Sequence, residues 1–355
     1  MIFNPNQLKK PLIIAGPCSA ESQEQMLTTA KSLSKDVSIF RAGVWKPRTR
    51  PNSFEGVGAP ALEWLKEVQS QTHLKVATEV ATPEHVEKCL EANIDVLWIG
   101  ARTTVNPFYV QEIAEALKGV DATVMVKNPL HPELSLWMGA IERLMMVGVK
   151  DIAAIHRGFF TLEQSIFRNE PKWELAIKLK RMHPDLPIIC DPSHISGSPT
   201  MIKEVSQTAM DLNMDGLMIE THFNPKIALS DAQQQITPDQ LNQLIQSLVL
   251  RTEVAQNQDF NSQLDVIRQK IDAIDNELIN TIGKRTELVK EIGRFKKQNG
   301  VTILQIQRWF EIIKTRQDWA NSKEIDKSMV SELFELIHKH SVLLQTHIMN
   351  QNNDD

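Results

Sequence analysis

With 355 residues, the chain is longer than one typical domain, so we expect two domains. Its 42% hydrophobic and 23% charged residues are values typical of globular proteins, and a net charge of −5 argues against a general surface for nucleic acid or for a membrane. Three cysteines without a CxxC motif argue against a disulfide framework, and the sequence has neither a signal-peptide pattern nor a long apolar run, so we expect a cytoplasmic protein.

Eight short apolar runs in the first 222 residues predict β-strands that are buried on both faces. In chain order they cover residues 12–17, 39–40, 76–78, 96–100, 124–126, 152–155, 188–190 and 217–219. Helical patterns separate these runs. Two of the helices carry clear start signals: Thr82 precedes a proline and an acidic residue, and Thr237 begins a capping box with Gln240.

This alternation predicts βα units, and eight such units in about 250 residues predict a (β/α)8 TIM barrel over residues 1–251. An open, doubly wound sheet is the alternative, and it would place the site at one switch point. Nearly every apolar run ends at a charged or metal-capable residue. Because a parallel barrel has its active site at the carboxyl ends of its strands, these residues are the candidate site.

The pattern changes after Arg251. We expect a polar linker over residues 252–260, a smaller all-α three-helix domain over 261–349, and a disordered tail over 350–355. Apolar residues from Leu264 to Phe295 alternate in steps of three and four, as in a coiled-coil seam, along a helix of roughly 55 Å over 261–297. We therefore expect an intertwined homodimer or a higher homo-oligomer.

Four residues near the strand ends form a candidate metal site: Cys18, His194, Glu220 and Asp231. A thiolate, an imidazole and two carboxylates suit a divalent first-row ion better than magnesium or calcium. Each residue also has an ordinary alternative role, such as a buried small hydrophobe for Cys18 or a helix cap for Asp231.

A second group near the strand ends is cationic, and it consists of Arg41, Lys46, Arg48, Arg102, Lys127 and Arg157. Solvated surface charges are the usual alternative, but these residues directly follow buried runs. Converging guanidinium and ammonium groups favour phosphate and carboxylate. The sequence contains no Walker A, GxGxxG or HExxH pattern, so nucleotide-dependent and zincin chemistries have little support.

Residues 10–250 resemble the type I 3-deoxy-D-arabino-heptulosonate-7-phosphate (DAHP) synthases. The motifs that carry the resemblance are Gly16-Pro17-Cys18-Ser19, Lys46-Pro47-Arg48-Thr49, Gly100-Ala101-Arg102-Thr103-Thr104, Asp191-Pro192-Ser193-His194 and Ile219-Glu220-Thr221-His222. The related octulosonate phosphate synthases usually have Lys-Ala-Asn-Arg in place of the second motif. The resemblance implies a TIM barrel that joins phosphoenolpyruvate to erythrose 4-phosphate with loss of phosphate. Because it begins near residue 10, we expect no long N-terminal extension of the kind that some members use for feedback control.

The resemblance also implies roles for particular residues. The family's metal ligands match Cys18, His194, Glu220 and Asp231, with Mn²⁺ favoured and Fe²⁺, Co²⁺ or Zn²⁺ as alternatives. Its phosphoenolpyruvate contacts match Arg41, Lys46, Ala101, Arg102, Lys127 and Arg157, and its erythrose phosphate contacts match Arg48 and Thr49. Glu79 and His156 match further active-site positions, and either could handle water and protons.

The C-terminal third resembles the all-helical chorismate mutases. A cation at the core heptad position of Arg285 is costly unless it lines a cavity, although a polar residue that sets the dimer register is the alternative. The matched residues are Arg268, Arg285, Lys296, Arg308, Ser341 and Gln345, while Gln305 stands where Asp is common and Trp309 where Glu is common. The resemblance implies cofactor-free rearrangement of chorismate to prephenate, in a pocket to which the partner chain supplies Arg285.

We therefore expect a bifunctional shikimate-pathway enzyme with phosphoenolpyruvate, erythrose 4-phosphate and chorismate as substrates, and feedback by prephenate or chorismate. One alternative makes the helical domain a non-catalytic module for dimerisation and regulatory ligand binding. Another makes the barrel an ordinary metal aldolase, which would not release phosphate from phosphoenolpyruvate.

Overall fold

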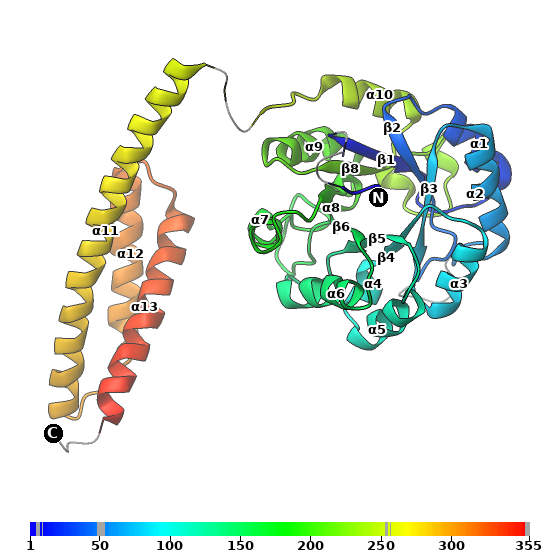
Figure 1. Ribbon diagram of the computed structural model, residues 1–355. Coiled ribbons are helices and arrows are strands. Elements are labelled where there is room, and N and C mark those ends of the chain that lie inside the picture. The colour runs from blue at the N-terminus through cyan, green and yellow to red at the C-terminus, as the bar shows by residue number, and fades with distance from the viewer. Residues whose placement is uncertain (5–7, 9, 48–53, 253–254, 256, 352–355) are drawn as a thin grey trace. The chain divides into compact units, whose positions relative to one another are not determined.

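The computed structural model describes residues 1–4, 8, 10–47, 54–252, 255 and 257–351 (Figure 1). The chain forms two compact units, Met1–Glu253 and Val254–Asp355. Among the described residues, no helix combines the length and the apolar character needed to cross a membrane.

The first unit is a closed barrel of parallel strands that follow one another in chain order. The strands in the described part of the chain are β1 (Leu12–Gly16), β2 (Val37–Arg41), β3 (Lys75–Val80), β4 (Val96–Ile99), β5 (Thr123–Lys127), β6 (Asp151–His156), β7 (Ile188–Cys190) and β8 (Gly216–Glu220). The ring closes because β1 pairs with β8, from Leu12 beside Gly216 to Gly16 beside Glu220. This closure confirms the predicted TIM barrel and excludes the open sheet.

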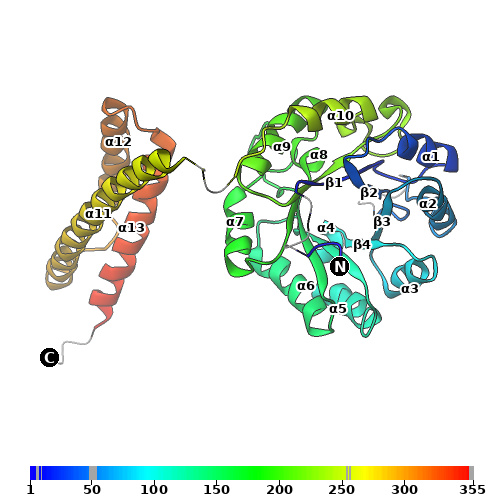
Figure 2. The same cartoon turned by 45° about the horizontal axis from the view of Figure 1, so that its top comes forward.

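Helices surround the ring of strands, as both views show (Figures 1 and 2). The longer ones are α1 (Gln23–Lys31), α2 (Pro60–Gln71), α3 (Pro83–Glu91), α5 (Pro107–Ala116), α6 (Leu134–Met146), α7 (Trp173–Met182), α9 (Ile202–Asp211) and α10 (Pro238–Ser247). The predicted start signals are confirmed: Thr82 caps α3, and the capping box of Thr237 and Gln240 opens α10. The short helices α4 (Ala101–Thr104) and α8 (Pro192–Ser196) directly follow β4 and β7.

The strands are buried on both faces, so successive residues contribute to two different cores. On β1, Ile14 belongs to the cluster inside the barrel, whereas Ile13 belongs to the cluster between strands and helices. Phe3 joins the inner cluster, and its backbone N–H donates to Asp151 at the start of β6 with a distance of 2.8 Å. The N-terminal segment therefore packs against the end of the barrel opposite the candidate site.

The second unit consists of three helices in the described part of the chain: α11 (Gln258–Gln298), α12 (Ile306–Ser322) and α13 (Lys327–Asn350). Helix α13 packs against both others. Helix α11 begins inside the expected linker, because the Asn257 side chain caps its first turn. The disordered tail was expected to begin at residue 350, but Asn350 is the last residue of α13. Residues 352–355 of that tail lie outside the described residues.

Candidate functional site

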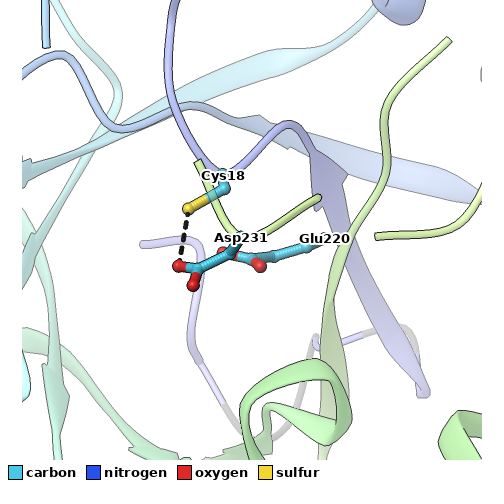
Figure 3. Close-up of side chains that lie close together, drawn as sticks. All are labelled: Cys18, Glu220 and Asp231. Carbon is cyan, nitrogen blue, oxygen red and sulfur yellow. Dashed lines mark hydrogen bonds between the residues drawn. The ribbon is translucent and has the colours of Figure 1, made fainter. Parts of the chain in front are cut away.

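Three of the predicted metal ligands meet at the carboxyl end of the barrel (Figure 3). Cys18 follows β1, Glu220 ends β8 and Asp231 precedes a short 3-10 turn. The pairing of β1 with β8 brings the first two together, and one potential ligand atom from each of the three residues lies within 4.8 Å of the others. The Cys18 Sγ–Asp231 Oδ2 distance is 3.3 Å.

The fourth predicted ligand, His194, lies on α8 with its Nε2 3.8 Å from the Glu220 carboxylate. Its Nδ1 lies 3.0 Å from Asp191 Oδ1, and the same oxygen accepts the His194 backbone N–H at the start of α8. Burial lowers the pKa of His194, which favours the neutral imidazole. We infer that Nδ1 carries the hydrogen, since it faces a carboxylate, and that the Nε2 lone pair faces Glu220.

The electrostatics of this cluster differ between its thiol and its carboxyl groups. Burial, reinforced by Glu220, raises the pKa of Cys18 to about 12, so the thiol is protonated at neutral pH without a metal. Burial would also raise the pKa of Asp231, but His194 and Arg168 outweigh it and lower that pKa. The donor set fits a divalent first-row ion, whose binding deprotonates a coordinating thiol.

A cavity beside this cluster contains most of the predicted cations. Its lining includes the predicted residues Lys46, Glu79, Ala101, Arg102, Lys127, Arg157, His194 and Asp231. His194 and Asp231 thus belong both to the cavity wall and to the candidate metal site. Arg48 and Thr49 lie outside the described residues.

The cations around the cavity are held by buried partners. Lys127 Nζ lies 2.8 Å from Asp191 Oδ2, and Arg41 NH1 donates to Glu220 Oε1 at 3.0 Å. Arg41 is fully buried, with its guanidinium 4.9 Å from the ring centre of Trp98. Arg41 thus contacts the Glu220 carboxylate of the metal cluster, and its predicted contact with phosphoenolpyruvate has no support from the described cavity lining.

The two candidates for handling protons differ in position. Glu79 lines the cavity and accepts a hydrogen bond from Trp98 Nε1 at 3.2 Å. Its carboxylate lies so close to Gly100 that any side chain at position 100 would clash, because a Cβ there would lie 2.0 Å from Glu79 Oε1. His156 is fully buried against Trp137 and Trp173, and burial lowers its pKa to about 3. This placement argues against the expectation that His156 handles protons, because the described cavity lining does not include it.

Three further residues, which were not among the predicted site residues, take part in this network: Asp191, Arg168 and Gln234. Asp191 stands in a recognised motif and directly before a proline, which is a helix-start signal. Arg168 lies in an irregular segment and Gln234 ends the short 3-10 turn Ala232–Gln234, where no periodic pattern marks a position, so their contacts could only be found in three dimensions.

In the helical unit, the predicted mutase residues divide into two groups. Arg285 NH1 donates to Ser341 Oγ at 2.9 Å, and Gln345 lies one turn further along α13, buried against Gly293. Arg285 thus contacts Ser341 of its own chain, which argues against the expectation that the partner chain supplies Arg285. Lys296 donates to the carbonyl of Ile303 at 2.6 Å.

The other predicted mutase residues are exposed. Arg268 and Arg308 form ion pairs with neighbours on their own helices, Asp265 and Glu311. Gln305 precedes α12 and is exposed. Among the described contacts, none joins these three residues to Arg285 and Ser341.

Trp309, which stands where the resembled mutases commonly have Glu, makes an aromatic contact. Its ring stacks on His338 with 3.8 Å between ring centres. Burial lowers the pKa of His338, and Arg285 and Lys296 lower it further, so the stacked pair lies within electrostatic reach of the cationic group. An aromatic surface therefore takes the place of a carboxylate there.

A closed (β/α)8 barrel with a cation-lined cavity at the carboxyl ends of its strands defines an enzyme for anionic substrates. The chain belongs to the DAHP synthetase I family, whose sequence pattern matches residues 7–257. The pattern of chorismate mutase type II matches residues 267–346.

The chain is similar to relatives of two related kinds. A phospho-2-dehydro-3-deoxyheptonate aldolase of Thermotoga maritima is 32% identical over 237 residues, which cover 66% of this chain and 68% of that protein. A 2-dehydro-3-deoxyphosphooctonate aldolase of Wolinella succinogenes is 26% identical, covering 68% of this chain and all of that protein. A crystal structure of the DAHP synthase from Thermotoga maritima matches with a TM-score of 0.60 and 30% identity, over 66% of this chain and 67% of that one.

The two matches confirm the expected fusion of a DAHP synthase domain with a chorismate mutase domain, which is a bifunctional enzyme of the shikimate pathway. Both activities follow from the two domains, which disfavours a purely regulatory helical unit. The DAHP synthase family is metal-dependent, in agreement with the cluster of Cys18, Glu220 and Asp231.

Proposed function

We propose that the barrel binds one divalent ion, preferably Mn²⁺, through Cys18, His194, Glu220 and Asp231. The proposal is supported by the thiol and carboxylate groups that meet within 4.8 Å, and by the imidazole whose free nitrogen faces Glu220. When bound, such an ion supplies Lewis-acid polarisation of the aldehyde oxygen of erythrose 4-phosphate. Fe²⁺, Co²⁺ and Zn²⁺ suit the same mixed donor set and remain alternatives.

The proposed role of the cations around the cavity is to hold phosphoenolpyruvate. Lys46, Arg102, Lys127 and Arg157 line one cavity and offer enough donors for a phosphate and a carboxylate. Arg157 is itself oriented by Asn169, to which its NH1 donates at 2.7 Å. The assignment of Arg48 and Thr49 to erythrose 4-phosphate rests on the family resemblance alone.

The reaction then proceeds between the two parts of the site. The enol C3 of phosphoenolpyruvate attacks the aldehyde carbon, water adds at C2 and phosphate leaves. Glu79 is the proposed group for handling the water and its protons, because its carboxylate lines the cavity. The observation that carries the proposal is that Asp231 belongs both to the wall of the anion cavity and to the metal cluster, while His194 on the same wall has its Nε2 3.8 Å from Glu220.

A phosphate-release assay tests this function. The protein is mixed with phosphoenolpyruvate, with or without erythrose 4-phosphate, before and after treatment with a chelator. We expect phosphate release only with both substrates, its loss after chelation and its return with added Mn²⁺. Aldol chemistry without phosphate release would support the ordinary metal aldolase instead.

For the helical unit, the proposal assigns the two carboxylates of chorismate to arginine side chains and the breaking ether bond to Lys296 and Gln345. The proximity of Arg285 to Ser341 and the buried amide of Gln345 support a polar pocket between α11 and α13. Preorganised donors of this kind stabilise the charge that develops on the ether oxygen, and no cofactor is needed.

The proposal includes a homodimer through α11. Apolar side chains along its heptad seam, namely Ile267, Ile271, Ile274 and Leu278, are between 51% and 63% exposed in the single chain. Arg268 lies 17 residues before Arg285, which is about 25 Å along a helix, so Arg268 of the partner subunit is the better candidate to complete the pocket. Replacing Ile271 and Ile274 by Asp should give monomers in light scattering, whereas Lys270→Asp should leave the dimer intact.

Feedback by prephenate or chorismate on the barrel is also part of the proposal, and it rests on the fusion of an early enzyme with a later one. Full-length protein and a form that ends at residue 255 are assayed for condensation with each compound. Inhibition of the full-length protein alone supports the route through the helical unit, and equal inhibition of both forms contradicts it.

The expected cytoplasmic location stays a prediction.

A further inference from the structure

Arg168 extends from the segment between β6 and α7 into the wall of the cavity, where sequence motifs gave no reason to expect it. Its NH1 donates to Asp231 Oδ1 at 3.0 Å and also to the side-chain oxygen of Gln234. One guanidinium therefore contacts a proposed metal ligand and a neutral amide in the same segment of chain.

Gln234 links Arg168 to the second carboxylate of the metal site, that of Glu220. It is buried, and its Nε2 donates to Glu220 Oε2 at 2.6 Å. The orientation of the amide is fixed, because a guanidinium can only donate and a carboxylate can only accept. Since Arg41 donates to Glu220 Oε1 at 3.0 Å, both oxygens of Glu220 have a donor.

The segment that carries Arg168 is itself held in place against α8. The backbone N–H of Arg168 donates to the carbonyl of Ser196 at 3.3 Å, and the side chain of Asn169 donates to the carbonyl of His194 at 2.6 Å. Gly197 has a left-handed backbone with φ +65°, and a Cβ there would lie 2.5 Å from the Cβ of Arg168. The packing thus favours one position of Arg168 relative to the helix of His194.

We propose that Arg168 is a positioning residue that sets the orientation of both carboxylates of the metal site, Asp231 directly and Glu220 through Gln234. This inference rests on the proposed metal site. Partners of this kind hold ligands in the geometry that an ion requires, and their loss typically costs roughly 10–100-fold in metal affinity.

The test measures binding of Mn²⁺ alone to the metal-free full-length chain, by electron paramagnetic resonance titration. We expect Arg168→Met and Gln234→Leu each to raise the dissociation constant roughly 10–100-fold. Arg168→Lys, which keeps the charge but lacks the planar fork, should lie between Arg168→Met and the parent protein. The double variant should lose less affinity than the product of the two single losses, because both act partly on Glu220.

Arg143→Met is the matched control, because Arg143 is also half-buried and donates to a carbonyl of its own helix α6, that of Gly139. It should bind Mn²⁺ like the parent protein. Melting of the metal-free variants gives a second readout, since a merely structural role would lower the melting temperature and leave the affinity of the folded protein unchanged.

The outcomes separate two failures. If the parent protein binds Mn²⁺ no better than Cys18→Ser, the proposed metal site is wrong. If Cys18→Ser binds Mn²⁺ more weakly than the parent protein while Arg168→Met and Gln234→Leu bind as Arg143→Met does, the positioning role is wrong and the site stands. Should Arg168→Met fail to fold, Arg168→Lys and Gln234→Leu decide the question in the same way.

Discussion

The carboxylate of Asp191 joins Lys127 to His194: its Oδ2 lies 2.8 Å from Lys127 Nζ and its Oδ1 lies 3.0 Å from His194 Nδ1. Burial would raise the pKa of Asp191, but His194 and Lys127 outweigh it and lower that pKa well below its usual range. One buried anion therefore orients a cation of the substrate cavity and the imidazole of the proposed metal site.

Asp191→Asn should weaken both metal binding and phosphoenolpyruvate binding. The amide can still cap α8, so the fold is kept, but it removes the negative charge that holds Lys127 and His194. We expect the Mn²⁺ affinity to fall roughly 10–100-fold, and the KM for phosphoenolpyruvate to rise. Calorimetry and steady-state kinetics measure the two effects, and a variant that keeps both parameters would contradict this role for Asp191.

Metal affinity should increase with pH because of Cys18. Without metal the thiol is protonated, since its pKa is raised to about 12, and binding as a thiolate releases that proton. The direction follows from this release: raising the pH removes a competing proton, so the apparent affinity should rise about tenfold per pH unit between pH 7 and pH 9. Titrations at several pH values check the slope, which should be lost in Cys18→Ser; equal slopes in both proteins would exclude a coordinating thiolate.

The sequence was sufficient for the barrel and for the chemical types of the site residues. Apolar runs that end at Cys18, Glu79, Lys127 and Glu220 specify strand ends, and strand ends in a closed barrel share one rim. The short helix α8 was missed because five residues are too few to show a helical period.

Other features depend on contacts that no linear pattern records. His156 matches an active-site position in the chain, but alternation along β6 and the rings of Trp137 and Trp173 keep it in the core. Arg285 was assigned to the partner chain, although the packing of α11 on α13 brings it to Ser341 of its own chain. Contacts between side chains that are far apart in the sequence become visible only in the three-dimensional structure.

His156 should make the protein sensitive to mild acid. Burial depresses its pKa to about 3, below the unfolded value of 6.5, so the folded state favours the neutral ring. This contribution to stability is fully present above pH 6.5 and is lost as the pH falls toward 3, with a limiting slope of about 1.4 kcal/mol per pH unit.

His156→Phe keeps an aromatic ring in this site and removes the titrating group. Urea unfolding of the metal-free protein between pH 7 and pH 5 should show a smaller loss of unfolding free energy for His156→Phe than for the parent protein. Parallel pH profiles for the two proteins would show that His156 is not the source of the sensitivity.

Arg285→Ala should abolish mutase activity and leave condensation nearly intact. The guanidinium donates to Ser341 in the proposed pocket of the helical unit, and removing one such donor typically lowers kcat roughly 100- to 1,000-fold. Arg294→Ala, on an exposed position of the same helix, is the control and should keep both activities. Parallel assays of chorismate loss and phosphate release test this, and equal loss of both activities would argue against separate sites.

The central feature of the proposed site is a thiolate of Cys18 that shares one ion with His194, Glu220 and Asp231. X-ray absorption spectroscopy at the edge of the bound metal tests this directly in the full-length protein. We predict one sulfur neighbour together with nitrogen and oxygen neighbours, and the loss of the sulfur signal in Cys18→Ser. A first coordination sphere of nitrogen and oxygen alone in the parent protein would contradict the proposed site.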